Sequence, residues 1–362
     1  MSTAAVVGTG LIGGSLGLAL REAGWDVVGF DLDATRAERA LGIGVCDRVA
    51  ATLDDAVRGV DIVIASVPVS SAAAIVIAAL DAGVPVVTDV GSAKSDLARD
   101  IGMARPEASA RFVGGHPMAG SEQDGLDGAD GGLFQGATWV LTPTERTDPG
   151  AFAAVRSLVS VVGAEILAVS PEDHDALVAV VSHVPQLAAS TLMDVAARRG
   201  EEHATLLRLA AGGFRDMTRI AASHPAIWPD ICVANQHAIT NALDQYIAAL
   251  NRVRDQVASS DRSGLLTLFE RARAARRNLP RGAPPTTALV EIRIPVPDRP
   301  GVLAEVTTLA GSLGVNIADV EIAHSVEGPG GVLVLVVAVE GAPALEAGLT
   351  ERGYHHTRVA LA

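Results

Sequence analysis

Residues 4–13, AAVVGTGLIG, decide the fold of the first part of this chain. A short apolar strand ends at Gly8, and a helical pattern begins at Leu11. In such a strand, turn and helix, the first glycine allows the tight turn, the second lets the backbone approach a pyrophosphate, and the third permits close helix packing. Free N–H groups at the helix start then face the phosphates. The stretch predicts a dinucleotide site formed by Gly8, Gly10, Leu11, Ile12 and Gly13.

An acid, Asp31, follows the second predicted strand (26–30) and lies 23 residues beyond Gly8. A carboxylate at this place accepts hydrogen bonds from the ribose hydroxyls of the adenosine and repels a 2′-phosphate. We therefore expect NAD as the cofactor rather than NADP, although Arg36 is close enough in sequence to weaken this preference. The alternative is that Asp31 only caps the following helix.

The alternation of short apolar strands with helices continues to residue 168. This pattern is typical of a parallel, doubly wound sheet with helices on both faces. We predict an α/β, Rossmann-type domain over residues 1–168, with further strands at 62–66, 84–89, 112–114, 137–141 and 164–169 and helices at 71–82 and 92–102.

Two further domains are predicted after residue 168. Residues 169–280 form an all-helical domain that begins with Ser170 as N-cap and Pro171 in the first turn. Helical blocks of this kind often bury their apolar faces against a second copy, so we expect a homodimer. A basic, proline-rich linker follows, and residues 286–362 have the order βαββαβ of a ferredoxin-like sandwich.

Composition excludes several classes of function. The chain has 362 residues, 49% of them hydrophobic, and a formal net charge of −14 without a basic run, which argues against nucleic-acid and anionic-membrane partners. The apolar stretch 62–80 divides into a strand, a turn and a helix, so we expect no membrane span and no leader. Two cysteines cannot form a disulfide framework, which favours the cytoplasm, and no cluster has metal-ligand spacing.

Three segments carry unusual chemistry: DVGSAK (89–94), GGHPMAGSE (114–122) and GGFRDMTRI (212–220). The first two follow predicted strands, and open α/β sheets bind their ligands at the carboxyl ends of strands. Histidine suits proton transfer at neutral pH, and arginine suits bidentate recognition of a carboxylate. Lys94, in the first segment, is the only lysine of the chain.

Three motifs occur in a fixed order along the chain: HPMAGSE (116–122), VSHVPQ (181–186) and GFRDMTRIA (213–221). With these motifs, the chain resembles the prephenate/arogenate dehydrogenase family of tyrosine biosynthesis over about residues 5–280. The tail, with its turn DRPG (298–301), looks like an ACT domain, a module that commonly binds amino acids. The resemblance implies that hydride passes from the carbinol carbon of a cyclohexadienyl substrate to NAD while a base takes the hydroxyl proton. Loss of CO₂ then aromatises the ring.

The resemblance also implies roles for individual residues. His116 matches the catalytic histidine, and Ser92 a serine that helps to orient the substrate hydroxyl and that histidine. On the substrate side, Arg219 matches an arginine that binds a carboxylate, and His183 matches a second histidine. Ser121, Glu122 and Asp216 match residues that line or gate the pocket, and Lys94 is expected to have a supporting role. In the tail we expect tyrosine as effector, bound near Arg299, Pro300, Gly301 and Asn316. His174, His224 and His237 are interpreted as surface or packing residues.

Alternatives remain open. Prephenate and arogenate differ only in a keto or amino group on the side chain, and no residue here decides between them. Another β-hydroxyacid-type dehydrogenase would need a catalytic lysine in the helical domain, and this chain has none there. A non-catalytic amino-acid sensor would use the tail alone, and the joint presence of Ser92, His116 and Arg219 argues against that reading.

Overall fold

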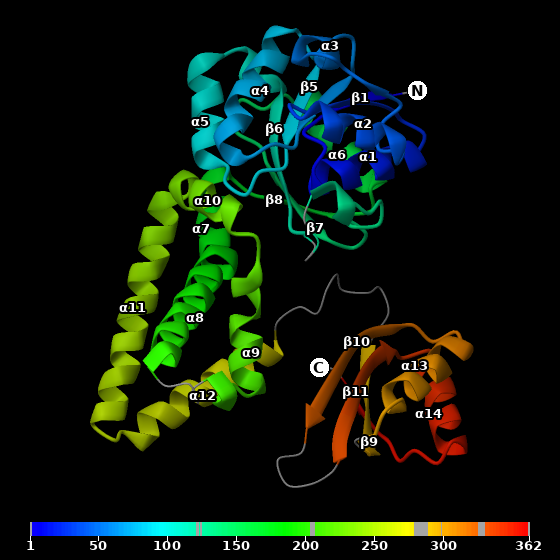
Figure 1. The fold of residues 1–362 in the computed structure, drawn as a ribbon, viewed down its shortest axis with the longest axis vertical. Helices are drawn as coiled ribbons and strands as arrows, with labels where there is room; N and C mark the ends of the chain where they lie inside the picture. The colour runs from blue at the N-terminus through cyan, green and yellow to red at the C-terminus, as the bar shows by residue number, and fades with distance from the viewer. Residues whose placement is uncertain are drawn as a thin grey trace. The chain divides into compact units, whose positions relative to one another are not determined.

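The computed structural model describes residues 2–120, 123, 125–202, 207–278, 289–297, 299–324 and 330–360. The chain divides into two compact units, Met1–Arg273 and Ala274–Ala362, and each is described by itself (Figure 1). The first unit contains both the α/β and the helical domains predicted from the sequence, and the second contains the predicted sandwich.

The first unit is built on one eight-stranded sheet of order β3-β2-β1-β4-β5-β6-β7-β8, with helices on both faces (Figure 1). Its strands are β1 Thr3–Val7, β2 Asp26–Phe30, β3 Arg48–Val49, β4 Ile62–Ala65, β5 Val86–Asp89, β6 Phe112–Pro117, β7 Thr138–Thr142 and β8 Glu165–Ala168. Its helices are α1 Leu11–Glu22, α2 Ala34–Gly42, α3 Leu53–Val57, α4 Val69–Asp81, α5 Ser95–Ala104 and α6 Pro149–Val161, with 3-10 turns at Ala108–Arg111 and Gly125–Gly128.

The predicted doubly wound sheet is confirmed, with three differences in detail. β7 runs antiparallel to β6, so the sheet is not parallel throughout. The two-residue edge strand β3 was missed because so short a segment leaves no alternating pattern. β6 continues to Pro117, so His116 lies in the strand and not in a loop after it. Two apolar clusters cover the two faces of the sheet and hold the strand ends in place.

The second part of this unit is helical throughout its described residues, as predicted. Its elements are α7 Pro171–Val178, a π-helical turn Ala179–His183, α8 Val184–Glu202, α9 Gly212–Thr218, α10 Trp228–Ala234, α11 Gln236–Ala258 and α12 Arg262–Arg277, with 3-10 turns at Leu207–Leu209, Arg219–Ala222 and Pro225–Ile227. Ser170 caps α7 by accepting from the N–H of Asp173, as expected. Ser95 Oγ donates to the carbonyl of Pro171 at 3.1 Å and ties this part to the sheet.

The π-helical turn Ala179–His183 ends two residues before Pro185. Proline has no N–H to close an α-helical bond to the carbonyl four residues earlier, so a wider turn at this place relieves the mismatch. The continuous helix Pro171–Gly200 is long and apolar enough to cross a membrane by length and composition alone, which is weak grounds for a span. This helix carries the buried polar residues His174, Asp175 and His183.

The second unit confirms the predicted order βαββαβ. Its elements are β9 Leu289–Pro297, α13 Val302–Ser312, β10 Ile317–His324, β11 Gly330–Ala338, α14 Ala342–Glu351 and β12 Thr357–Ala360. The antiparallel sheet has the order β10-β11-β9-β12. Alternate side chains of the strands pack with the two helices in one apolar core, which includes Ile292, Leu335 and Leu345.

The glycines of the first turn differ in the space around them, and this difference gives a test. A Cβ on Gly13 would lie 1.9 Å from the carbonyl oxygen of Gly8, whereas a Cβ on Gly10 would meet nothing within 4 Å. We expect Gly13→Ala to lower the free energy of unfolding of the first unit by about 1–3 kcal/mol through overpacking. Gly10→Ala, at the N-cap of α1, should cost at most about 1 kcal/mol.

Tryptophan fluorescence during urea unfolding measures this difference, because Trp25, Trp139 and Trp228 are the three tryptophans of the chain and all lie in the first unit. An equal loss of stability in the two variants would contradict the steric account of the turn.

Candidate active site

The predicted site residues of the sheet gather at the carboxyl ends of β1, β5 and β6. Gly8 follows β1, and its φ of +93° is a left-handed conformation that favours glycine. Ser92 lies in the connection between β5 and α5, and His116 lies near the end of β6. Because β1, β4, β5 and β6 are consecutive strands of the sheet, these segments share one edge. This is the edge at which open α/β sheets bind ligands.

Lys94 and Asp89 form a buried ion pair behind this edge. The Lys94 ammonium donates to Asp89 Oδ2 and also to the carbonyl of Gly115 at 2.8 Å. The two side chains are 1% and 0% exposed, and Asp89 also accepts from the N–H groups of Gly91 and Gly115. Burial lowers the pKa of Lys94, and the neighbouring Asp89 counteracts this effect. The carboxylate that Lys94 faces is therefore one of this chain's own.

His116 is connected to the helical domain through two hydrogen bonds. Its Nδ1 lies 2.8 Å from Nε2 of His174, and Nδ1 of His174 lies 2.8 Å from Oδ1 of Asp175. All three side chains are buried. Asp175 in turn accepts from the main-chain N–H groups of Lys94 at 2.9 Å and Ser95 at 2.8 Å. The connection therefore runs from β6 through α7 to the start of α5.

The imidazole of His116 is held neutral at neutral pH. Burial lowers its pKa well below 6.5, the charge of Lys94 lowers it further, and Asp175 acts in the opposite direction. A neutral imidazole has a free lone pair on one nitrogen, as a general base requires.

His183, in the π-helical turn, is also buried and neutral. Burial is the main cause that lowers its pKa to about 4. Asn235 Nδ2 donates to the carbonyl of Asp175 at 2.9 Å and lies 3.2 Å from Nδ1 of His183. The carbonyl can only accept, which fixes the amide with its NH₂ toward both groups. Nδ1 of His183 therefore accepts, and its ring proton is on Nε2.

The first turn has the features that a dinucleotide needs. Asp31 accepts from the N–H and the hydroxyl of Thr9 at 2.9 and 3.1 Å, so it also fixes the glycine turn. Arg36 lies 3.3 Å from Asp31. The helix cap considered for Asp31 belongs to Asp33, which accepts from the N–H groups at the start of α2. The open space beside Gly10 leaves the start of α1 accessible to a pyrophosphate.

The other predicted substrate residues are placed as follows. Arg219 and Asp216 are exposed, and they lie where α9 passes into the 3-10 turn Arg219–Ala222, which packs on α8. Ser92 is half-buried, and no hydrogen bond joins it to a described residue. Ser121 and Glu122 lie outside the residues that the structure describes.

Residues that the sequence analysis missed complete this site. His174 was interpreted as a surface or packing residue, and it is buried, but that interpretation did not include its hydrogen bond to His116. His224 and His237 are exposed, in agreement with that interpretation. Asp175 and Asn235 were not singled out. The sequence feature that could have pointed to this connection is the pair of neighbouring polar residues His174 and Asp175 in a predicted helix.

The predicted effector residues divide into two places. Arg299 and Gly301 follow β9, whose end pairs with Gly330, whereas Asn316 precedes β10, whose start pairs with Val337. The register puts these loops at opposite ends of the sheet, about 24 Å apart along a strand at 3.4 Å per residue. Within one chain they cannot contact the same amino acid. Arg299 pairs with Glu305 through both nitrogens, at 2.9 and 2.7 Å.

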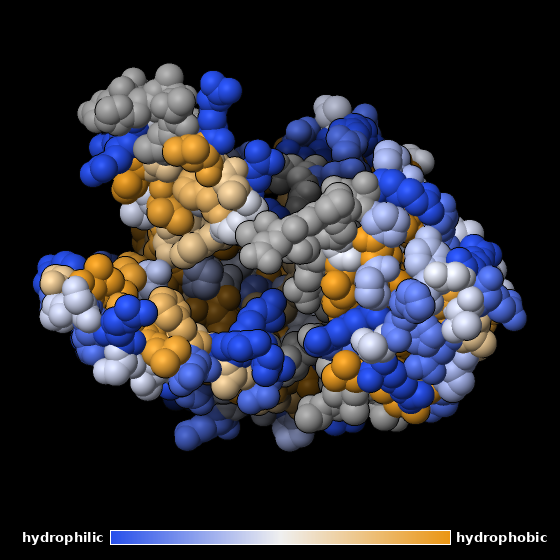
Figure 2. All heavy atoms as spheres, turned by 90° about the horizontal axis from the view of Figure 1, so that it is seen from below, coloured by the Kyte–Doolittle hydropathy of each residue, from blue (hydrophilic) through white to orange (hydrophobic). Residues whose placement is uncertain are grey.

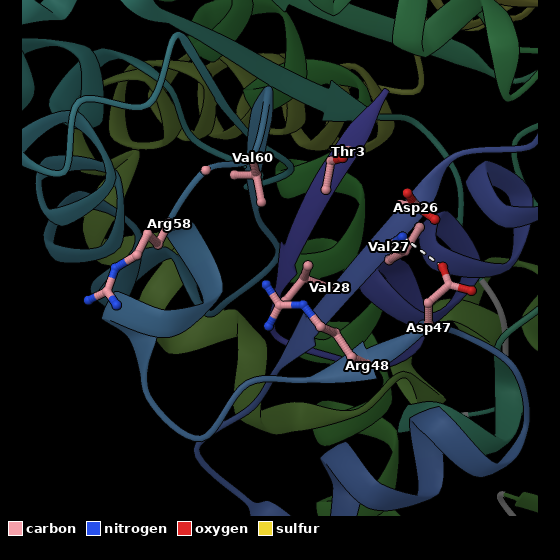
Figure 3. Close-up of a pocket in the computed structure, with 9 residues that line it drawn as sticks. Thr3, Asp26, Val27, Val28, Asp47, Arg48, Arg58 and Val60 are labelled. Atoms are coloured by element: carbon pink, nitrogen blue, oxygen red, sulfur yellow. Dashed lines mark hydrogen bonds between the residues drawn. The ribbon is translucent and has the colours of Figure 1, made fainter. Parts of the chain in front are cut away.

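A pocket of about 290 Å³ lies at the other edge of the large sheet (Figure 3). Thr3 and Asp26 begin β1 and β2, and Arg58 precedes β4, so this pocket is at the amino ends of the strands. It is therefore not the predicted site. Among the described residues, no group of three or more His, Cys, Asp and Glu side chains could hold a metal ion.

Family comparisons cover nearly the whole chain. Residues 16–168 match the nucleotide-binding domain of prephenate dehydrogenase, residues 170–271 its dimerization domain, and residues 290–352 an ACT domain. A Bacillus subtilis prephenate dehydrogenase is 34% identical over 91% of this chain and 91% of its own length. A Zymomonas mobilis cyclohexadienyl dehydrogenase is 34% identical over 75% of this chain and 94% of its own length.

Solved structures agree with these matches. Prephenate dehydrogenase from A. aeolicus, in complex with hydroxyphenyl propionate and NAD+, has a TM-score of 0.71 and 30% identity, covering 77% of this chain and 99% of its own. Synechocystis arogenate dehydrogenase has a TM-score of 0.67 and 30% identity, covering 76% of this chain and 98% of its own. The predictions of an NAD-dependent dehydrogenase and of an ACT domain are thereby confirmed, and the chain belongs to the prephenate dehydrogenase family.

Proposed function

We propose that the chain is an NAD-dependent prephenate dehydrogenase, which converts prephenate to 4-hydroxyphenylpyruvate and CO₂. The observation that carries this proposal is the buried, neutral His116 at the carboxyl end of β6, beside the connection that holds Ser92. Two relatives, each matched over more than 90% of its own length, carry the names prephenate and cyclohexadienyl dehydrogenase, and they support this substrate class. Arogenate is the alternative substrate, since an arogenate dehydrogenase is among the similar structures.

In this mechanism each residue of the site has its own role. His116 takes the proton of the substrate hydroxyl, and Ser92 helps to orient that hydroxyl. Arg219 binds a substrate carboxylate, and the Nε2–H of His183 donates to a substrate oxygen. Asp31 and the start of α1 would hold the ribose and the pyrophosphate of NAD, whose nicotinamide would supply the hydride acceptor, while Lys94 fixes the strand ends.

The remaining predicted residues keep supporting roles in the proposal. Asp216 lies three residues before Arg219, and we assign Asp216 and Glu122 to the lining or gating of the pocket, with Ser121 beside Glu122 in the sequence. The free cysteines Cys46 and Cys232 agree with a reducing compartment, so we place the enzyme in the cytoplasm.

The helical domain exposes apolar side chains that favour a homodimer. Figure 2 shows apolar atoms at the surface on the left of the view, where this domain lies. Exposed large hydrophobic residues of these helices include Val180, Val181, Val195, Ile247, Leu250, Leu266 and Phe269. Single exposed apolar residues are ordinary, but a series along neighbouring helices indicates a covered surface.

A direct test assays NAD and NADP with prephenate and with arogenate, in the wild type and in His116→Asn. We expect the fastest turnover with prephenate and NAD. His116→Asn should lower kcat by about 10²- to 10⁴-fold because the base is lost, with unchanged NAD affinity. His355→Asn, which changes an exposed histidine of the second unit, is the matched control. If NADH forms from neither substrate, the proposal is wrong. If His116→Asn loses NAD binding together with kcat, His116 has a structural role instead of a catalytic one.

Sedimentation tests the homodimer. The expected mass is about twice the 37.0 kDa of one chain. High salt should leave it unchanged, because an apolar interface is not screened by ions. A mass of one chain at micromolar concentration would contradict this assignment.

Tyrosine is the proposed effector of the ACT domain, and its inhibition of the enzyme tests the two loops separately. We expect Arg299→Ala and Asn316→Ala each to weaken inhibition by about tenfold, with kcat unchanged, since both loops are exposed and lie in the second unit. Arg358→Ala is the control, because Arg358 lies on the edge strand β12 and pairs with Glu346. Inhibition that is equal in all three variants and the wild type would refute tyrosine binding at these loops.

A further inference from the structure

Two buried polar residues, His174 and Asp175, have no part in the mechanism so far. They connect to the base through the hydrogen bonds Asp175 Oδ1 to His174 Nδ1 and His174 Nε2 to His116 Nδ1, each 2.8 Å long. The side chains of His174 and Asp175 are 1% and 5% exposed. A connected pair this deeply buried needs a definite arrangement of protons, because an unsatisfied polar group is costly there.

The direction of the hydrogen bonds follows from Asp175. Burial acts to raise the pKa of its carboxyl, but hydrogen bonds from His174, Ser95 and Lys94 outweigh burial and keep the pKa below its usual range. Asp175 is thus an anion that can only accept, so Nδ1 of His174 carries a proton. In a neutral His174 the other nitrogen, Nε2, then accepts, and Nδ1 of His116 must donate. The free lone pair of His116 is therefore on Nε2.

We propose that His174 and Asp175 are positioning residues that hold His116 in the Nδ1–H tautomer and leave Nε2 as the base. This rests on the proposed function of His116 as the base of the dehydrogenase reaction. When His116 Nε2 takes the hydroxyl proton, the Nδ1–H bond to His174 becomes charge-assisted and stabilises the imidazolium. The other charged and titratable groups that face His116 are Lys94, whose charge opposes the imidazolium, and His183.

The pair also makes the base depend on the contact between the two domains of the first unit. His116 belongs to β6, whereas His174 and Asp175 belong to α7. Asp175 is held by main-chain N–H groups of Lys94 and Ser95 at the start of α5, and Asn235 of the helical domain donates to its carbonyl. His116 therefore has its correct tautomer only while α7 is packed against the start of α5.

Two substitutions of His174 separate positioning from structure. His174→Phe keeps a ring in the space but removes the acceptor for His116 Nδ1. His174→Gln places an amide oxygen near the position of Nε2, so it can still accept. We expect His174→Phe to lower kcat about 10²-fold, with KM for prephenate and NAD within about threefold of wild type. His174→Gln should recover at least tenfold of this loss, and His355→Phe, an exposed control, should behave as wild type.

The tautomer of His116 is measured without substrate, by NMR of protein labelled with ¹⁵N at the histidine rings. The signals of His116 are identified as those that are absent from the spectrum of His116→Asn. The wild type should carry its proton on Nδ1 of His116, and His174→Phe should lose that preference. A wild-type proton on Nε2, an undiminished kcat in His174→Phe, or an equal loss in His174→Phe and His174→Gln would each overturn the positioning role. If the tautomer is as expected and neither prephenate nor arogenate is oxidised, the proposed function fails while the positioning of His116 stands.

Discussion

The ion pair between Lys94 and Asp89 is the interaction on which the site depends. Two opposite charges are buried at the carboxyl ends of β5 and β6, and the ammonium also holds the carbonyl of Gly115, next to His116. Removing either partner would leave an uncompensated charge in the core, which typically costs about 3–5 kcal/mol. The main-chain N–H of Lys94 at the same time binds Asp175. One residue therefore joins two strands and a helix of the other domain.

The same arrangement sets the electrostatics of the base. Burial and the nearby ammonium keep His116 in its neutral form, so one ring nitrogen is free to accept a proton. The carboxylate of Asp175 acts in the opposite direction and makes the protonated state attainable during the reaction. Because Lys94 and Asp175 are both anchored by hydrogen bonds to the main chain, their effects on His116 are built into the fold and do not need a ligand to form.

Much of the fold could be predicted because its signals are local. The glycine turn at residues 8–13, the cap of α7 at Ser170 and the order of elements in the second unit are all encoded within short windows of sequence. The antiparallel direction of β7 was not predictable in this way, since it depends on which edge of the sheet the chain meets after a long connection. The edge strand β3 is too short to show a period.

The site was predictable only where a motif carried it. His116 was found through its surroundings in sequence, whereas His174 was missed because its burial follows from the packing of α7 on the sheet. Lys94 was noticed as unusual, but its contacts could not be deduced, since the fold brings Asp89 to its ammonium and Asp175, distant in sequence, to its main-chain N–H. The opposite positions of Arg299 and Asn316 follow from strand register, which composition does not encode.

The burial of the single lysine has a practical consequence for chemical work on this protein. Apart from the amino terminus, the chain offers one primary amine, and that amine is 1% exposed and occupied by two acceptors. Amine-directed labels will therefore attach at the terminus of the folded chain, and a protease specific for lysine has a single bond to cut, at the start of α5. Labelling or cleavage at Lys94 thus reports the opening of the active-site edge itself.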